Sequence, residues 1–120
     1  MSIYIIVNQI MMRHKITLPQ LKKYDITQKV IMALADAESR VILFSIIRKG
    51  KTASDLSGSL KIPLSSVYKK LSDLENLTLV RVEKTILSEK GRRFKVYRSR
   101  INKAEISIKK PEPTLSLSAN

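Results

Sequence analysis

The sequence predicts an α+β fold that is mainly α-helical and carries one small β-hairpin. Two observations support this class. Apolar residues recur at spacings of three and four between residues 27 and 76, which is the period of helices packed on a core. From Leu79 onward the spacing changes to alternation, which is the period of strands. A chain of 120 residues has room for one domain with one core.

The ends of the chain differ in composition from its middle. Residues 1–25 begin with an apolar run that includes "IYIIV", and we expect this segment to pack on the domain or to contribute dimer contacts. The run is too short to cross a membrane, and its basic residues follow it, unlike those of a signal peptide. Residues 26–103 are expected to form the folded domain. Residues 104–120, which contain "KKPEPTLSLSAN", are expected to form a flexible tail.

Two helices are expected at the start of the domain. The first runs from Thr27 to Ala37, where apolar residues form one stripe. Ser39 is expected to cap the second, whose body is "RVILFSIIRK", and Gly50 is expected to end it in the left-handed conformation. The second helix is apolar on most sides, which predicts a place at the centre of the core.

A pair of shorter helices follows. Thr52 and Asp55 have the spacing of a capping box, which predicts a helix as far as Leu60. Pro63 fits the first turn of a further helix that runs to about Asn76. Two short helices joined by a tight turn make a helix-turn-helix, in which the second helix enters the major groove of DNA.

The second helix of this pair has a polar face opposite its apolar stripe of Val67, Leu71 and Leu74. The serines of its first turn are expected to bind phosphate, and Lys69 to reach a guanine edge. Tyr68 and Lys70 lie on the flanks, where the sugar-phosphate backbone is in reach. Asp73 would repel phosphate, so we expect it away from the closest approach. The DNA contacts predicted on this helix are Ser65, Ser66, Tyr68, Lys69, Lys70 and Ser72.

The alternating segments 79–88 and 94–101 predict two strands joined by the turn "SEKGRR", in which Gly91 supplies a positive φ. A hairpin directly after a recognition-type helix is a wing. Either Asn76 or Thr78 is expected to make the turn into it without the help of a glycine. The residues predicted to bind DNA on the wing are Lys90, Arg92, Arg93 and Lys95.

Charge supports a polyanionic partner. The chain has a formal net charge of +13, which exceeds what solubility requires. Between Arg81 and Lys110 there are eleven basic and three acidic residues, so this stretch is expected to follow phosphates with a steep dependence on salt. Arg92 and Arg93 at the hairpin tip are the candidates for a minor groove.

The segments "ESRVILFSIIRKGK" and "TASDLSGSLKIPLSSVYKKLSDLENLTLVRVEK" resemble the winged helix-turn-helix of ArsR-like (arsenic-repressor-type) transcriptional regulators, in particular their short, basic archaeal members. The resemblance covers residues 27–101. It implies a positioning helix at Ala53 to Leu60, a recognition helix holding the serines and lysines named above, and a wing tip at Glu89 to Arg93. It also implies binding of double-stranded DNA. We expect a homodimer whose contacts come from the first helix, from the apolar N-terminal segment, or from both.

Other chemistry is poorly supported by the sequence. Metal-sensing relatives carry cysteine pairs or histidine clusters, whereas this chain has no cysteine and His14 alone, so no metal, cofactor or small-molecule effector is expected. A single histidine, scattered acidic residues and three separate glycines offer no catalytic constellation, so we expect no enzyme.

The expected function is that of a sequence-specific transcriptional regulator on the nucleoid in the cytoplasm. Two alternatives use the same fold. One is an architectural chromatin protein or RNA-binding protein without sequence preference, for which high charge suffices. The other is a protein-protein adaptor in a transcription complex.

Overall fold

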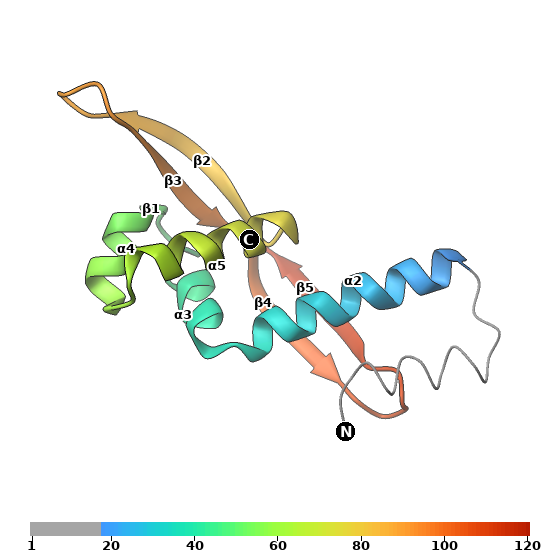
Figure 1. Ribbon diagram of the computed structural model, residues 1–120. Helices are drawn as coiled ribbons and strands as arrows, with labels where there is room; N and C mark the ends of the chain where they lie inside the picture. The colour runs from blue at the N-terminus through green and yellow to red at the C-terminus, as the bar shows by residue number, and fades with distance from the viewer. Residues whose placement is uncertain (1–17) are drawn as a thin grey trace.

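The computed structural model describes residues 18–120, with side chains from residue 26 onward, and these residues form a mixed α+β fold (Figure 1). The helices are α2 (Leu18–Ala35), α3 (Ala37–Ser45), α4 (Ala53–Leu60) and α5 (Leu64–Asn76). The strands are β1 (Lys51–Thr52), β2 (Val80–Leu87), β3 (Arg93–Ser99), β4 (Ile101–Ser107) and β5 (Thr114–Ala119). The predicted α+β class is confirmed. The predicted dimer contacts of "IYIIV" lie outside the described residues.

The first helix is longer than predicted. α2 begins at Leu18 rather than Thr27, so the expected boundary between residues 25 and 26 falls inside a helix. Pro19 stands in its first turn, where a missing N–H costs nothing. The prediction of Ser39 as the cap of the next helix is also wrong. Asp36 is the N-cap of α3, and its Oδ2 accepts hydrogen bonds from the Ser39 N–H at 2.9 Å and the Ser39 hydroxyl at 2.7 Å.

α3 ends at Ser45, five residues before the predicted end at Gly50. The backbone carbonyls that would continue the helix are used elsewhere. The Ile46 carbonyl accepts from the Ser99 N–H at 3.0 Å, and the Ile47 carbonyl accepts from Arg98 Nε at 2.9 Å. Gly50 does not have a positive φ. A β-carbon there would lie 2.7 Å from Val96 Cγ1, so glycine permits a close approach to β3.

The two short helices agree with their predicted bounds. Thr52 and Asp55 form both hydrogen bonds of the capping box at the start of α4. Lys61 ends α4 in the left-handed conformation with φ 56°, and α5 begins directly after Pro63. The apolar stripe of α5 is buried as predicted, since Val67, Leu71 and Leu74 are at most 1% exposed.

The turn out of α5 is made by Thr78, one of the two predicted candidates. Thr78 has φ 61°. Its N–H donates to the Glu75 carbonyl, and the Leu79 N–H donates to the Leu74 carbonyl at 3.0 Å. This is the Schellman arrangement, with threonine at the position that glycine normally occupies. The β-branched side chain is strained there.

Strands β1, β3 and β2 form an antiparallel sheet in that order. The predicted hairpin is confirmed as β2–β3, and Gly91 in its turn has φ 80°. A bulge between Val82 and Lys84 leaves Glu83 unpaired in the ladder. Figure 1 shows this hairpin extending well beyond the helices. The short strand β1 was missed by the sequence analysis because two residues show no period.

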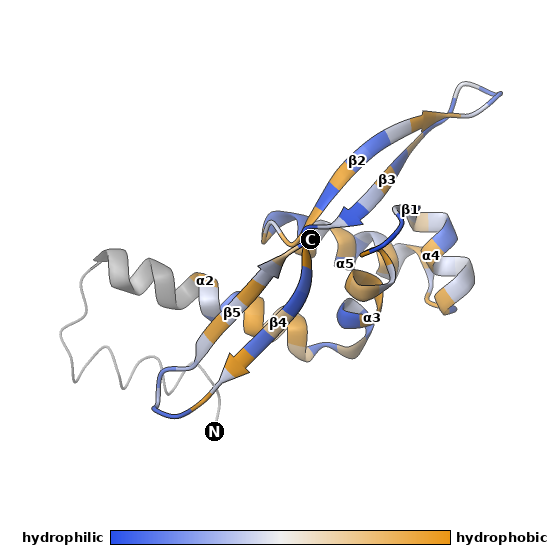
Figure 2. Cartoon of the chain, turned by 180° about the vertical axis from the view of Figure 1, so that it is seen from behind, coloured by the Kyte–Doolittle hydropathy of each residue, from blue (hydrophilic) through white to orange (hydrophobic). Residues whose placement is uncertain are grey.

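The prediction of a flexible tail over residues 104–120 is wrong. Strands β4 and β5 pair antiparallel from Ile101 and Ala119 to Ser107 and Thr114. Apolar residues alternate with polar ones along both strands (Figure 2), and Ala104 and Leu115 pack against the core. That contact explains why the segment is ordered. The hairpin runs beside α2, in the direction opposite to β2–β3 (Figure 1).

The core lies where α3, α4, α5 and the bases of the two hairpins meet. Its fully buried side chains come mainly from these elements, and they are Ile42, Leu43, Ile46, Leu56, Val67, Leu71, Leu74, Leu79, Val80 and Ser99. The placement of α3 at the centre is therefore confirmed. Among the described residues, none of the helices combines the length and the apolar character that crossing a membrane needs.

Candidate nucleic-acid interface

The exposed face of α5 carries most of the residues predicted from the helix pattern. Ser65, Tyr68, Lys69 and Ser72 are exposed, whereas Ser66 and Lys70 are half-buried. Pro63 at the N-cap provides no side-chain hydrogen bond, so the backbone N–H groups of the first turn have no side-chain acceptor. The N-terminus of a helix with such N–H groups favours the binding of an anion.

Lys69 lies at the centre of this face and pairs with Asp73. The distance from Lys69 Nζ to Asp73 Oδ1 is 3.0 Å, and the two side chains are 75% and 52% exposed. We expected Asp73 to lie away from the closest approach to phosphate, and the structure instead puts it beside the principal lysine. An exposed pair of this kind is weak. Lys69 can therefore exchange Asp73 for an acceptor on a ligand.

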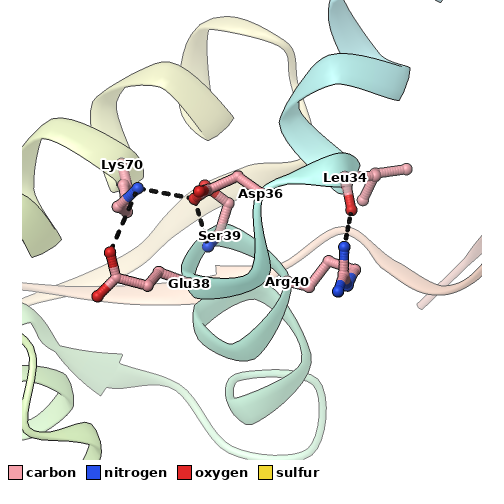
Figure 3. A network of polar contacts seen from close by, with 6 residues as sticks. All are labelled: Leu34, Asp36, Glu38, Ser39, Arg40 and Lys70. Carbon is pink, nitrogen blue, oxygen red and sulfur yellow. Dashed lines mark hydrogen bonds and ion pairs between the residues drawn. The ribbon is translucent and has the colours of Figure 1, made fainter.

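Lys70, which was predicted to contact the DNA backbone, forms ion pairs within the protein. Its Nζ lies 2.7 Å from Asp36 Oδ2 and 3.7 Å from Glu38 Oε1, and only 22% of its side chain is exposed (Figure 3). The acidic residues stand at the N-terminus of α3, where the helix dipole favours them. Lys70 thus joins α5 to the corner between α2 and α3. On the same corner, Arg40 donates to the Leu34 carbonyl at the end of α2.

The pKa values of this pair move in opposite directions. The hydrogen bond from Lys70, followed by those from Ser39, lowers the pKa of Asp36 to about 2. The hydrogen bond to Asp36 raises the pKa of Lys70. The stabilisation by Asp36 is present above its unfolded pKa of 3.8 and is lost as the pH falls through about 2. The stabilisation by Lys70 is lost only as the pH rises beyond 10.5.

A groove of about 880 Å³ separates α5 from α2 and the start of α3. Apolar side chains of Met32, Ala33, Leu74 and Leu77 are among its lining. Four predicted site residues also line it, namely Ser65, Ser66, Lys69 and Lys70. The first turn of α5 therefore faces a hollow rather than a flat surface.

A smaller hollow of about 280 Å³ lies on the other flank of α5, next to β3. Tyr68 from α5 and Arg93 and Lys95 from β3 line it together with Thr52 and Ser54 at the start of α4. Tyr97 is also part of the lining, and burial raises the pKa of its phenol. This hollow brings together residues from both predicted DNA-binding elements. The sequence analysis missed the contribution of Thr52 and Ser54, because their proximity to β3 depends on the fold.

The tip of the β2–β3 hairpin carries Lys90 and Arg92, both exposed, which line a third hollow of about 540 Å³. The turn is held by its own hydrogen bonds, since the Ser88 hydroxyl accepts from the Arg92 N–H at 3.0 Å. Arg98 lies nearer the base and pairs with Glu83 at 3.1 Å. Because both of these side chains are only 28% exposed, Arg98 is fixed within the protein.

The predicted residues thus fall into three groups, one along the groove, one in the hollow beside β3 and one at the hairpin tip. Ser72 is exposed and lines none of these three surfaces. Among the side chains of residues 26–120, no three histidine, cysteine, aspartate or glutamate residues come together as metal ligands. The sequence matches no protein-family model, and no curated protein is similar to it.

Proposed function

We propose that this protein is a winged helix-turn-helix transcriptional regulator that binds double-stranded DNA. One observation carries the proposal. One hollow joins Tyr68 of α5 to Arg93 and Lys95 of a projecting hairpin whose distal half is strongly basic. The capping box, the tight turn at Lys61 and the start of α5 at Leu64 also agree with a helix-turn-helix.

In this proposal α5 enters the major groove. Lys69 leaves Asp73 and donates to the O6 and N7 acceptors of guanine, while Ser65 and Ser66 hold a phosphate at the helix N-terminus. Tyr68 and Lys95 bind the sugar-phosphate backbone beside the groove. Lys70 takes no part in binding, because its charge is committed to Asp36 and Glu38.

The β2–β3 hairpin acts as the wing. Arg92 and Arg93 lie at its tip, where their charge can follow the backbone or enter a minor groove. Two copies of the chain bind two half-sites about one helical turn apart, and the occupied promoter changes transcription.

A second candidate is an architectural nucleic-acid-binding protein. The observation that favours it is the amount of charge, since +13 is more than one recognition helix and one wing tip use. Such a protein would bind every duplex, or RNA, with similar affinity and a steep dependence on salt.

The test is selection of bound sequences from a random DNA duplex library, followed by affinity measurements across a salt series. The selected duplex and a scrambled duplex of equal length are compared. We expect a repeated motif that binds about 10³-fold more tightly than the scrambled duplex. Tight binding without preference would support the architectural candidate, and no binding to DNA duplexes or to RNA at low salt would overturn both.

A further inference from the structure

The β4–β5 hairpin presents one strand edge that lacks the usual protection. Its two strands form a sheet of their own, and no third strand pairs with it among residues 18–120. No strand therefore pairs with the outer backbone N–H and C=O groups of either edge, although α2 also contacts β5. A two-stranded sheet is marginally stable by itself, and pairing at an edge would extend it.

The two edges differ in their chemistry. β4 carries Lys103 and Glu105, which form an ion pair at 2.9 Å, and a bulge leaves Asn102 as an extra residue. Charges and bulges are the devices that keep edge strands from pairing. β5 has neither. Its sequence "TLSLSA" contains no charged residue and no proline. Its pairing with β4 is regular except opposite the bulge at Asn102. Ser116 and Ser118 are exposed.

We propose that β5 pairs antiparallel with the β5 strand of a second copy of this chain, joining two hairpins into a four-stranded sheet. Charge favours a second copy at this hairpin over the basic β2–β3 hairpin. Two chains of +13 repel each other over most of their surfaces, but the hairpin from Ile101 to Ala119 holds three basic and two acidic residues. The apolar face would also become continuous, since Ile106 and Leu117 are 42% and 40% exposed in one copy.

The pattern of β5 limits the register of this pairing. Residues directly opposite each other share a face of a sheet, and in β5 the serines alternate with the leucines. A twofold axis through the sheet therefore sets Ser116 opposite either Ser116 or Ser118 of the second copy. Both registers bring serines together on one face and leucines together on the other.

This interface deepens the proposed function, because it names the surface that would join the proposed homodimer. Each β2–β3 hairpin extends away from its own β4–β5 hairpin (Figure 1). Pairing at β5 would leave α5 and the basic hairpin of both copies free at the two ends of the dimer. The test uses no DNA, so its result is independent of whether the chain binds DNA.

The experiment is sedimentation velocity of the full chain over a concentration series. The main variant is Ser116→Lys with Ser118→Lys, which sets like charges opposite each other in either register. Within one copy, Ser116 faces Glu105 and Ser118 faces Lys103, so one of the two new lysines has an opposite charge across the strand pair and the other a like charge, and the two effects offset each other. The control is Ser59→Lys with Asn102→Lys, which adds the same charge at exposed positions on α4 and on the β4 edge.

We expect the wild type and the control to dimerise with equal affinity and the main variant to dimerise about tenfold more weakly. Mixing the main variant with Ser116→Glu plus Ser118→Glu should restore the dimer, which a folding defect would not allow. A wild type that stays monomeric at all concentrations would overturn the interface. A dimer that the main variant leaves unchanged would assign the contact to another surface.

Discussion

The two hairpins of this protein have similar lengths and differ in net charge. Between Val80 and Ser99 the first hairpin holds seven basic and two acidic residues, whereas the second, from Ile101 to Ala119, holds three and two. They diverge at Ser99, whose buried hydroxyl donates to the Ile101 carbonyl at 2.6 Å. One continuous chain therefore supplies a basic end suited to a polyanion and a nearly neutral end suited to apolar contact.

This difference implies a division of labour that substitutions can test. Changes at the basic end should alter DNA binding and leave the free energy of unfolding unchanged. Changes at the base of the nearly neutral β4–β5 hairpin should alter the free energy of unfolding and leave DNA binding unchanged. Lys70 and Thr78 offer a further test of this difference. Lys70 lies in α5 and Thr78 follows its end, and both have structural roles.

The largest effect is expected at Ile101, where β4 leaves the core. This side chain is 5% exposed, so Ile101→Ala should lower the free energy of unfolding by about 2–4 kcal/mol. Ile108, at the far end of the hairpin, is 75% exposed, and Ile108→Ala should change it by less than about 0.5 kcal/mol. Urea denaturation measures both. Equal effects would mean that the hairpin is not anchored at its base.

At the basic end, Arg92→Ala with Arg93→Ala should weaken binding to every duplex, because two phosphate contacts are lost. The slope of log affinity against log salt should fall by about two, which is on the order of fiftyfold in affinity near 0.1 M salt. Lys103→Ala with Lys109→Ala removes the same charge from the neutral hairpin and should have a much smaller effect. An unchanged slope in the arginine variant would contradict the assignment of the wing.

On α5, Ser65→Ala with Lys69→Ala should reduce discrimination between the selected and scrambled duplexes by about tenfold. Binding to the scrambled duplex should change much less, because phosphate contacts remain elsewhere. The matched control is Ser59→Ala with Lys49→Ala, which changes the same residue types at exposed positions. Competition binding at fixed salt measures all of them, and an equal loss on both duplexes would argue against base contacts.

Lys70→Met should lower the free energy of unfolding by about 0.5–1 kcal/mol at neutral pH, since the pair with Asp36 is partly exposed. The difference from the wild type should shrink between pH 4 and pH 2, as Asp36 is protonated. Lys69→Met is the control and should leave stability unchanged. DNA affinity that falls as much in Lys70→Met as in Lys69→Met would show that Lys70 is also a contact.

The smallest effect is expected at Thr78. Glycine tolerates the left-handed conformation that threonine adopts there, so Thr78→Gly should raise the free energy of unfolding by up to about 1 kcal/mol. Thermal denaturation measures the change, with Thr85→Gly in β2 as a control that should destabilise. A destabilised Thr78→Gly variant would mean that the threonine side chain contributes more than its strain costs.

Local rules predicted the parts of the molecule that depend on neighbouring residues. The capping box of Thr52 and Asp55, the buried stripe of α5 and the turn at Gly91 all follow from residues within one element. They were predicted correctly for that reason. The polar face of α5 follows from the same helical period, although its use in DNA binding stays a prediction.

Several of the wrong or missed predictions lie where distant parts of the chain meet. Gly50 failed as a helix terminator because β3 and Asn120 take the carbonyls of Ile46 and Ile47. The segment expected to be a tail forms strand β5, because Leu115 packs against the core. The ion pair of Lys70 with Asp36, 34 residues away, was likewise not predicted from the sequence, while its contact with DNA stays a prediction.

The sequence by itself determined the basic charge, the helical and alternating periods and the polar face of α5, because these are properties of composition and short spacing. Only the tertiary structure decided which charges are free to meet a ligand and where the last strands go. Those outcomes depend on which groups satisfy each other across the core, and no local pattern records that choice.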